Sequence, residues 1–169
     1  LEAAISRTVA AAGADIWKQT ADLLNKKGEE LRKAGIGVAY HNHNLDFAPI
    51  GKTTGWDILW HETQADLVAY ELDIGWVQLA GIDPVRFLDK VRGRVKLLHV
   101  RDMSDRQTRG YRVAMGSPTV GTGLLDWERI LPAAYRAGAR HFLVEQEPAG
   151  TVPMDAAENA FSFLSRLKA

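Results

Sequence analysis

The hydrophobic and polar positions of this chain follow two patterns, one typical of strands and one typical of helices, which alternate along the sequence. Apolar runs of strand length cover about residues 37–43, 67–74, 95–103 and 140–146, and each run ends in polar residues. Elsewhere apolar residues recur every three or four positions, as in amphipathic helices, at about 14–34, 56–63, 83–91, 126–138 and 154–167. This alternation of helices and strands predicts a parallel sheet with right-handed crossovers.

Local signals mark where the helices begin and end. Asp83 followed by Pro84 predicts a helix start, Asp126 predicts another, and Gly35 is expected to end the first helix. The Ala-rich residues 1–13 fit either a frayed helix or the remnant of an earlier element. The first helix is predicted to bury one face, which holds Ile16, Leu23, Leu24 and Leu31.

Four strands cannot close a parallel α/β barrel, because that barrel needs eight. The sequence therefore predicts one α/β domain over residues 1–169, either with an open sheet or as a partial (half) TIM barrel. In the half-barrel case, four parallel strands alternate with helices and the N-terminal half of the barrel is expected to be absent. Two strand edges would then be exposed, and we expect a partner or self-association, such as a homo-oligomer, to cover them.

Each predicted strand ends in a side chain that can bind a metal, namely His41, Asp73, His99 and Glu145. Parallel α/β folds place their chemistry at these strand ends. Because strand side chains alternate between faces, the deeper positions on the same faces are predicted to pack beneath the site: Ala39, Ala69, Leu97 and Leu143. Two imidazoles and two carboxylates suit a divalent ion such as Mn²⁺, Co²⁺, Zn²⁺, Fe²⁺, Ni²⁺ or Mg²⁺. The alternative is that each of the four residues is an ordinary polar side chain at a strand end, whose hydrogen bonds are made to the backbone or to a neighbouring helix.

Four more side chains are expected near this site, and each has a structural alternative. His43 can move a proton or bind substrate, or it can pack within a loop. Arg101 can bind a hydroxyl, carboxylate or phosphate group of a substrate, or it can pair with Glu71 or Glu147. Trp76 can stack on a sugar ring or belong to the core. Glu147 can bind substrate or orient a ligand histidine, or it can be exposed.

Composition narrows the function classes. The formal net charge is zero, which gives no electrostatic signal for nucleic acid or an anionic membrane surface. The absence of cysteine excludes disulfides, thiolate catalysis and cysteine zinc sites. No apolar run reaches membrane-spanning length, so we expect no membrane partner and a cytoplasmic protein. His61, on a helix, and His141, at the start of a strand, are assigned to structure.

Five stretches carry a resemblance to a known family: YHNHNLDF at 40–47, ELDIGW at 71–76, LLHVRDM at 97–103, VGTGLLDW at 120–127 and FLVEQE at 142–147. In this order they resemble the sugar phosphate isomerase/epimerase family, whose fold is the xylose-isomerase-like TIM barrel. The resemblance runs from about residue 14 to the end and corresponds to the C-terminal half of that barrel. It identifies the fold and superfamily but not the substrate.

The resemblance implies four metal ligands of the type Glu, Asp, His and Glu on successive strand ends. By motif position they fall on His41, Asp73, His99 and Glu145. His41 departs from the Glu of the sugar epimerases, in which the first and last Glu act as an acid/base pair on opposite faces of the substrate. The His-Asn-His version resembles members with isomerase, dehydratase or keto-sugar lyase activity.

The lead hypothesis is a divalent-metal sugar or keto-sugar isomerase or epimerase that transfers a proton next to a carbonyl, with Glu145 or His43 moving the proton. A dehydratase or lyase acting on a keto-sugar or cyclitol is the related alternative. A second hypothesis is an inactive half-barrel that associates with a partner copy. A third, a metal-dependent abasic-site endonuclease on the same barrel, is disfavoured by the zero net charge.

Overall fold

A computed structural model describes residues 2–104, 109–111, 116–146 and 152–167, with side chains from Gly13 onward. Its central sheet has four parallel strands in the order β1 (Val38–His41), β4 (Val68–Asp73), β5 (Val95–Val100) and β6 (His141–Val144). Helix α1 (Glu2–Arg32) precedes the strands and α6 (Pro153–Leu164) follows them. The helices between the strands are α2 (Gly55–Glu62), α3 (Ile74–Leu79), α4 (Pro84–Lys90) and α5 (Trp127–Ala137). A short helix, η1 (Asn44–Phe47), and a hairpin of β2 (Pro49–Ile50) and β3 (Thr53–Thr54) follow β1. The fold confirms the predicted α/β class: it is a partial TIM barrel with four parallel strands alternating with helices.

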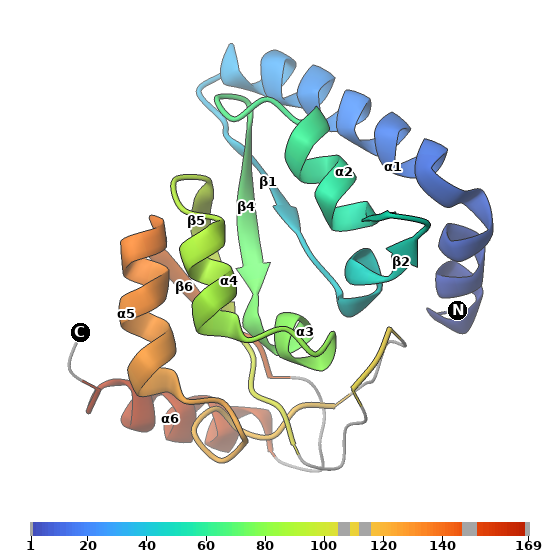
Figure 1. The fold of residues 1–169 in the computed structure, drawn as a ribbon. Coiled ribbons are helices and arrows are strands. Elements are labelled where there is room, and N and C mark those ends of the chain that lie inside the picture. Colours follow the sequence, from blue (N-terminus) through green and yellow to red (C-terminus); the bar gives the residue numbers. More distant parts are fainter. Residues whose placement is uncertain (1, 105–108, 112–115, 147–151, 168–169) are drawn as a thin grey trace.

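The helices cover one face of the sheet, and Figure 1 shows α2, α4 and α5 in front of the strands. On that face the strand side chains are fully buried, as Val68, Tyr70, Leu72, Leu98 and Val100 show. The opposite face, which would line a barrel, is less covered by the part of the chain described. Ala39, Ala69 and Leu97 are half-buried there, and Leu143 is 40% exposed. These four residues are therefore less buried than the prediction that they pack beneath the site implied. An open sheet lacks the opposing strands that would bury them.

The first helix differs most from its prediction. It extends back to Glu2 across a kink at Gly13, where φ is 60°. Its buried positions include Trp17 and Ala21, whereas Ile16 and Leu23 are 36% and 56% exposed. The Trp17 ring lies against Gly55, where any Cβ would collide with it. Leu24 and Leu31 of the predicted face remain partly buried, and Leu24 packs against the buried cluster that contains Trp17. Burying the large indole outweighs burying Ile16 and Leu23, so the buried face is centred on Trp17 and Ala21.

Two predicted helix starts are confirmed by their hydrogen bonds. Asp83 accepts a hydrogen bond from the backbone N–H of Arg86, with Pro84 at the first position of α4. Asp126 accepts one from the N–H of Arg129 at the start of α5. Helix α3 was not expected, because the preceding strand was predicted to run to Ile74 and no element was assigned to the residues that follow it. Asp73 ends β4 and caps α3 at the same time, since its Oδ1 accepts from the N–H of Trp76 at 2.9 Å.

The segment between β5 and α5 is organised by a fully buried carboxylate, Asp102. Five N–H groups donate to it, at 2.8–3.2 Å: those of Met103, Gly121, Gly123 and Leu125 in the backbone and the indole of Trp127. Five donors replace the hydration that this carboxylate gives up on burial. Asp102 thereby joins the end of β5 to the start of α5. No described helix is long and apolar enough to cross a lipid bilayer.

We expect Asp102→Ala to lower the free energy of unfolding by at least about 3 kcal/mol, because several buried N–H groups lose their acceptor together. The matched control is Asp126→Ala, which removes an exposed helix cap 24 positions further on and is expected to cost about 1 kcal/mol. Urea denaturation of both variants measures the difference. Equal, small losses would contradict the organising role of Asp102.

Candidate metal centre

The carboxyl ends of three neighbouring strands bring two imidazoles and one carboxylate together. In the sheet register Asp73 on β4 pairs with His99 on β5, and His41 on β1 pairs with Glu71. His41, Asp73 and His99 each offer one ligand atom, and these atoms all lie within 4.8 Å of one another. Oδ2 of Asp73 is 3.6 Å from Nε2 of His41 and 3.4 Å from Nδ1 of His99.

Glu145 lies beside this cluster, directly after β6. Its Oε2 is 3.2 Å from Nδ1 of His99 and 3.9 Å from Nε of Arg101. The backbone N–H of Glu145 donates to the carbonyl of Val100 at 3.1 Å, which continues the pairing with β5 past the end of the strand. Glu145 therefore meets the cluster through His99 and is not one of the three mutually close residues.

The chemistry of these donors fits a divalent cation. Among the described residues, Oδ2 of Asp73, Nδ1 of His99 and Oε2 of Glu145 are buried and make no hydrogen bond of ordinary geometry. Leaving a buried polar atom without such a partner costs about 1–3 kcal/mol. Two of these atoms, on Asp73 and His99, belong to the cluster, and the third lies beside His99. A bound cation would satisfy them, and imidazole with carboxylate suits first-row divalent metals.

The neighbouring charges shift the pKa values in opposite directions. Burial lowers the pKa of His41 to about 4, and repulsion from His99 and His43 adds to this. Burial also acts to lower the pKa of His99, but close polar contacts with Asp73 and Glu145 outweigh it and raise that pKa to about 10. Contact with His99 holds the pKa of Glu145 below its usual value, whereas burial raises the pKa of Asp73. A cation that binds His99 would have to displace the proton that this raised pKa keeps on the ring.

The other predicted site residues lie next to the cluster, but two of them are buried. The His43 ring is 5.2 Å from the ring of His41 and 5.2 Å from that of Trp76. The Arg101 guanidinium lies 3.8 Å over the Trp76 ring, and the two residues are 0% and 2% exposed. Trp76 therefore belongs to the hydrophobic core as well as to the wall of the site. Glu147, predicted to bind substrate or orient a ligand histidine, lies outside the described part of the chain.

Two buried residues near the site were missed by sequence reasoning. Asn42 bonds to the backbone of Asp73 through its side-chain amide. Asp46 accepts from the N–H of His43 at 3.0 Å and from the Tyr40 hydroxyl at 2.9 Å, which fixes the backbone at His43. Burial raises the pKa of Asp46 to about 7. Both residues follow β1, and for Asn42 its place between the two site histidines was the available signal.

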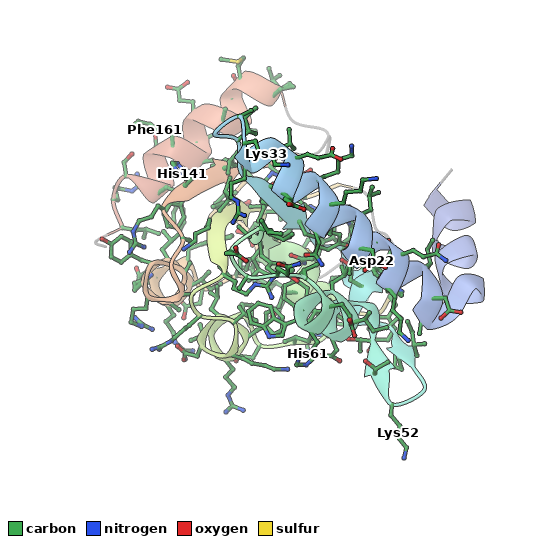
Figure 2. The ribbon with its side chains drawn as sticks, turned by 90° about the horizontal axis from the view of Figure 1, so that it is seen from above. Asp22, Lys33, Lys52, His61, His141 and Phe161 are labelled. Atoms are coloured by element: carbon green, nitrogen blue, oxygen red, sulfur yellow. The ribbon has the colours of Figure 1, made fainter. Side chains whose placement is uncertain are left out.

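The two histidines assigned to structure lie away from the cluster. Figure 2 shows His61 on α2 and His141 at the start of β6, both at the outside of the molecule. Both side chains are exposed. They serve as reference positions for tests of the cluster.

Comparison with known proteins confirms the family resemblance at the level of the superfamily. No family model matches the sequence. Inosose dehydratases are among the relatives: that of Lacticaseibacillus casei is 28% identical over 163 residues, which cover 89% of this chain and 54% of that protein. That of Clostridium beijerinckii is 28% identical over 161 residues, covering 88% and 53%. The chain thus spans about half the length of the relatives it matches.

Solved structures give the same picture for the fold. A sugar phosphate isomerase/epimerase from Parabacteroides distasonis superposes with a TM-score of 0.78 at 26% identity, over 92% of this chain and 55% of that one. An L-ribulose 3-epimerase superposes with a TM-score of 0.67 at 19% identity, over 88% and 52%. At 19% identity, the likeness to the L-ribulose 3-epimerase shows a shared fold and nothing about function. The structural neighbours are thus xylose-isomerase-like TIM barrels, of which this chain matches about half.

Proposed function

We propose that this chain supplies the divalent-metal site of an enzyme that removes a proton next to the carbonyl of a keto-sugar or keto-cyclitol. The observation that carries the proposal is the convergence of His41, Asp73 and His99, whose ligand atoms lie within 4.8 Å of one another. Glu145 is the fourth proposed ligand, because its Oε2 is a buried atom without a hydrogen bond beside His99. A divalent ion at such a site supplies positive charge that polarises a carbonyl oxygen and stabilises the negative charge that develops on it.

The sheet order supports a division of labour between two proton-transfer groups. Glu145 follows β6 and His43 follows β1, and these are the two edge strands of the sheet. The two groups therefore approach the cluster from opposite sides. In the proposed reaction Glu145 takes the proton from carbon, because its lowered pKa keeps the carboxylate ionised. His43 gives a proton to a departing hydroxyl group.

Dehydration and epimerisation share this first step and differ in the second. In dehydration the electron pair left on carbon forms a C=C bond while the hydroxyl group of the next carbon leaves as water. In epimerisation a proton returns to the opposite face of the same carbon. His41 replaces the Glu that the epimerase pattern places there, and inosose dehydratases are among the relatives. Both points favour loss of water from a keto-cyclitol or keto-sugar over isomerase or epimerase activity.

Metal binding is the first test. We expect the chelator-treated protein to bind one Mn²⁺ or Co²⁺ per chain, and His99→Ala to weaken this binding by about 100-fold or more, because the variant removes a ligand. Isothermal titration calorimetry measures both. His61→Ala, an exposed histidine on α2, is the control and should bind as the unaltered protein does. Undiminished binding by His99→Ala would overturn the assignment.

The reaction is tested with a keto-cyclitol in D₂O. We expect loss of water, seen by NMR as an alkene signal, and an activity about 10²- to 10⁴-fold lower in Glu145→Gln, which cannot accept the proton. Glu128→Gln, an exposed residue of α5, is the control. Deuterium incorporation with inversion and without water loss would show an epimerase instead. Full activity in Glu145→Gln would exclude this residue as the base.

An inactive half-barrel that associates with a second copy is the other candidate, and the exposure of β6 favours it. Phe142, Leu143 and Val144 are each about 40% exposed, although the strands of parallel sheets are normally covered on both faces. Each edge strand, β1 and β6, pairs on one side only within the described residues. Association through these edges would complete the sheet.

Multi-angle light scattering across a concentration series distinguishes these candidates. Association through the edges predicts a dimer mass, and Leu143→Lys should reduce it because a charge enters the covered surface. Tyr135→Lys, an exposed apolar residue of α5, is the control. A catalytically active monomer would exclude the half-barrel alternative.

A further inference from the structure

We infer that Asn42 is a positioning residue that holds the metal-binding aspartate in place through the backbone. This inference rests on the proposed metal site. The side-chain Nδ2 of Asn42 donates to the carbonyl oxygen of Asp73 at 3.2 Å, and its Oδ1 accepts from the N–H of Asp73 at 2.8 Å. Both residues are fully buried, so water cannot take over either bond.

The amide of Asn42 extends the sheet beyond the last backbone pair. Parallel pairing of β1 with β4 ends at His41 and Glu71, and the chain then leaves the strand direction to form η1. Without Asn42, the backbone of Asp73 would face no hydrogen-bonding partner from β1. A primary amide carries one donor and one acceptor side by side, as a peptide group does, and therefore substitutes for the missing strand residue.

Asp73 is then fixed from three directions, and one carboxylate oxygen is left for the site. Asn42 holds its backbone from the β1 side, and pairing with His99 holds it from the β5 side. The N–H of Trp76 occupies its Oδ1. Oδ2 remains directed at the two imidazoles, 3.4–3.6 Å away. Removing Asn42 releases the first of these constraints and leaves two buried backbone groups of Asp73 unpaired.

The chain contains a matched control for this arrangement. Asn25 on α1 makes the same kind of bridge: its Nδ2 donates to the carbonyl of Glu62 at 2.9 Å, and its Oδ1 accepts from the N–H of Gln64 at 2.8 Å. Gln64 lies before β4, at the end of the strand opposite Asp73. Asn25→Ala thus removes a donor–acceptor pair of the same chemistry, although an exposed one, at a distance from the cluster.

The experiment compares Asn42→Ala, Asn42→Asp and Asn25→Ala in two measurements on the full chain. One is the midpoint of urea unfolding without metal, and the other is the affinity for Mn²⁺ by calorimetry. We expect both Asn42 variants to bind Mn²⁺ about 10- to 100-fold more weakly, the usual effect of removing a residue that orients a ligand. Asn42→Asp keeps an acceptor for the Asp73 N–H but loses the donor to its carbonyl. Asn25→Ala should lower the unfolding midpoint and leave Mn²⁺ affinity within about twofold.

Three outcomes are distinct. Weaker Mn²⁺ binding in the Asn42 variants alone supports the positioning role. Unchanged affinity with a lower unfolding midpoint would show that Asn42 only joins two strands, and would overturn the inference while the metal site stands. Absence of Mn²⁺ binding by the unaltered protein would overturn the metal site itself, together with this inference. If Asn42→Ala does not fold, Asn42→Asp decides by the same criterion.

Discussion

The parallel pairing of β4 with a strand on each side is the interaction on which the site depends. It sets the ends of β1, β4 and β5 level, so that Asp73 lies between two imidazoles from its neighbours. No local motif along the chain could do this, because these residues are 32 and 26 positions from their nearest partners in the cluster. The helices on one face keep the strands in register by burying their aliphatic side chains, and the chemistry occupies the end that the helices leave open.

The polar groups around the cluster are arranged at the expense of stability. Three buried atoms, on Asp73, His99 and Glu145, have no ordinary hydrogen bond, and the surrounding side chains do not relax to satisfy them. The surrounding scaffold is held firmly: the Arg101 guanidinium lies over the Trp76 ring, and Asp102 accepts from five N–H groups. Firmly held neighbours can keep buried polar atoms in place without hydrogen bonds.

Sequence reasoning reached the features that depend on periodicity and missed those that depend on single side-chain contacts. Strand ends in parallel sheets converge, so the alternation of apolar runs sufficed to predict the fold class and to bring His41, Asp73 and His99 together. The buried face of α1 was assigned correctly for Leu24 but wrongly for Ile16 and Leu23. One contact between Trp17 and Gly55 fixes that face, and no helical period encodes a partner 38 positions away. Helix α3 was missed because Asp73 serves as strand end and helix cap at once. Asn42 and Asp102 bond to backbone groups distant in sequence, and composition and spacing do not indicate which backbone groups those are.

The short helix α3 has a mechanical consequence for the site. At its first turn it is tied to one carboxylate oxygen of Asp73, and through the Trp76 ring it supports Arg101, whose guanidinium reaches toward Glu145. One short helix therefore contacts two parts of the site, the Asp73 carboxylate and the Arg101 guanidinium. A substitution that displaces α3 would disturb both of them at once.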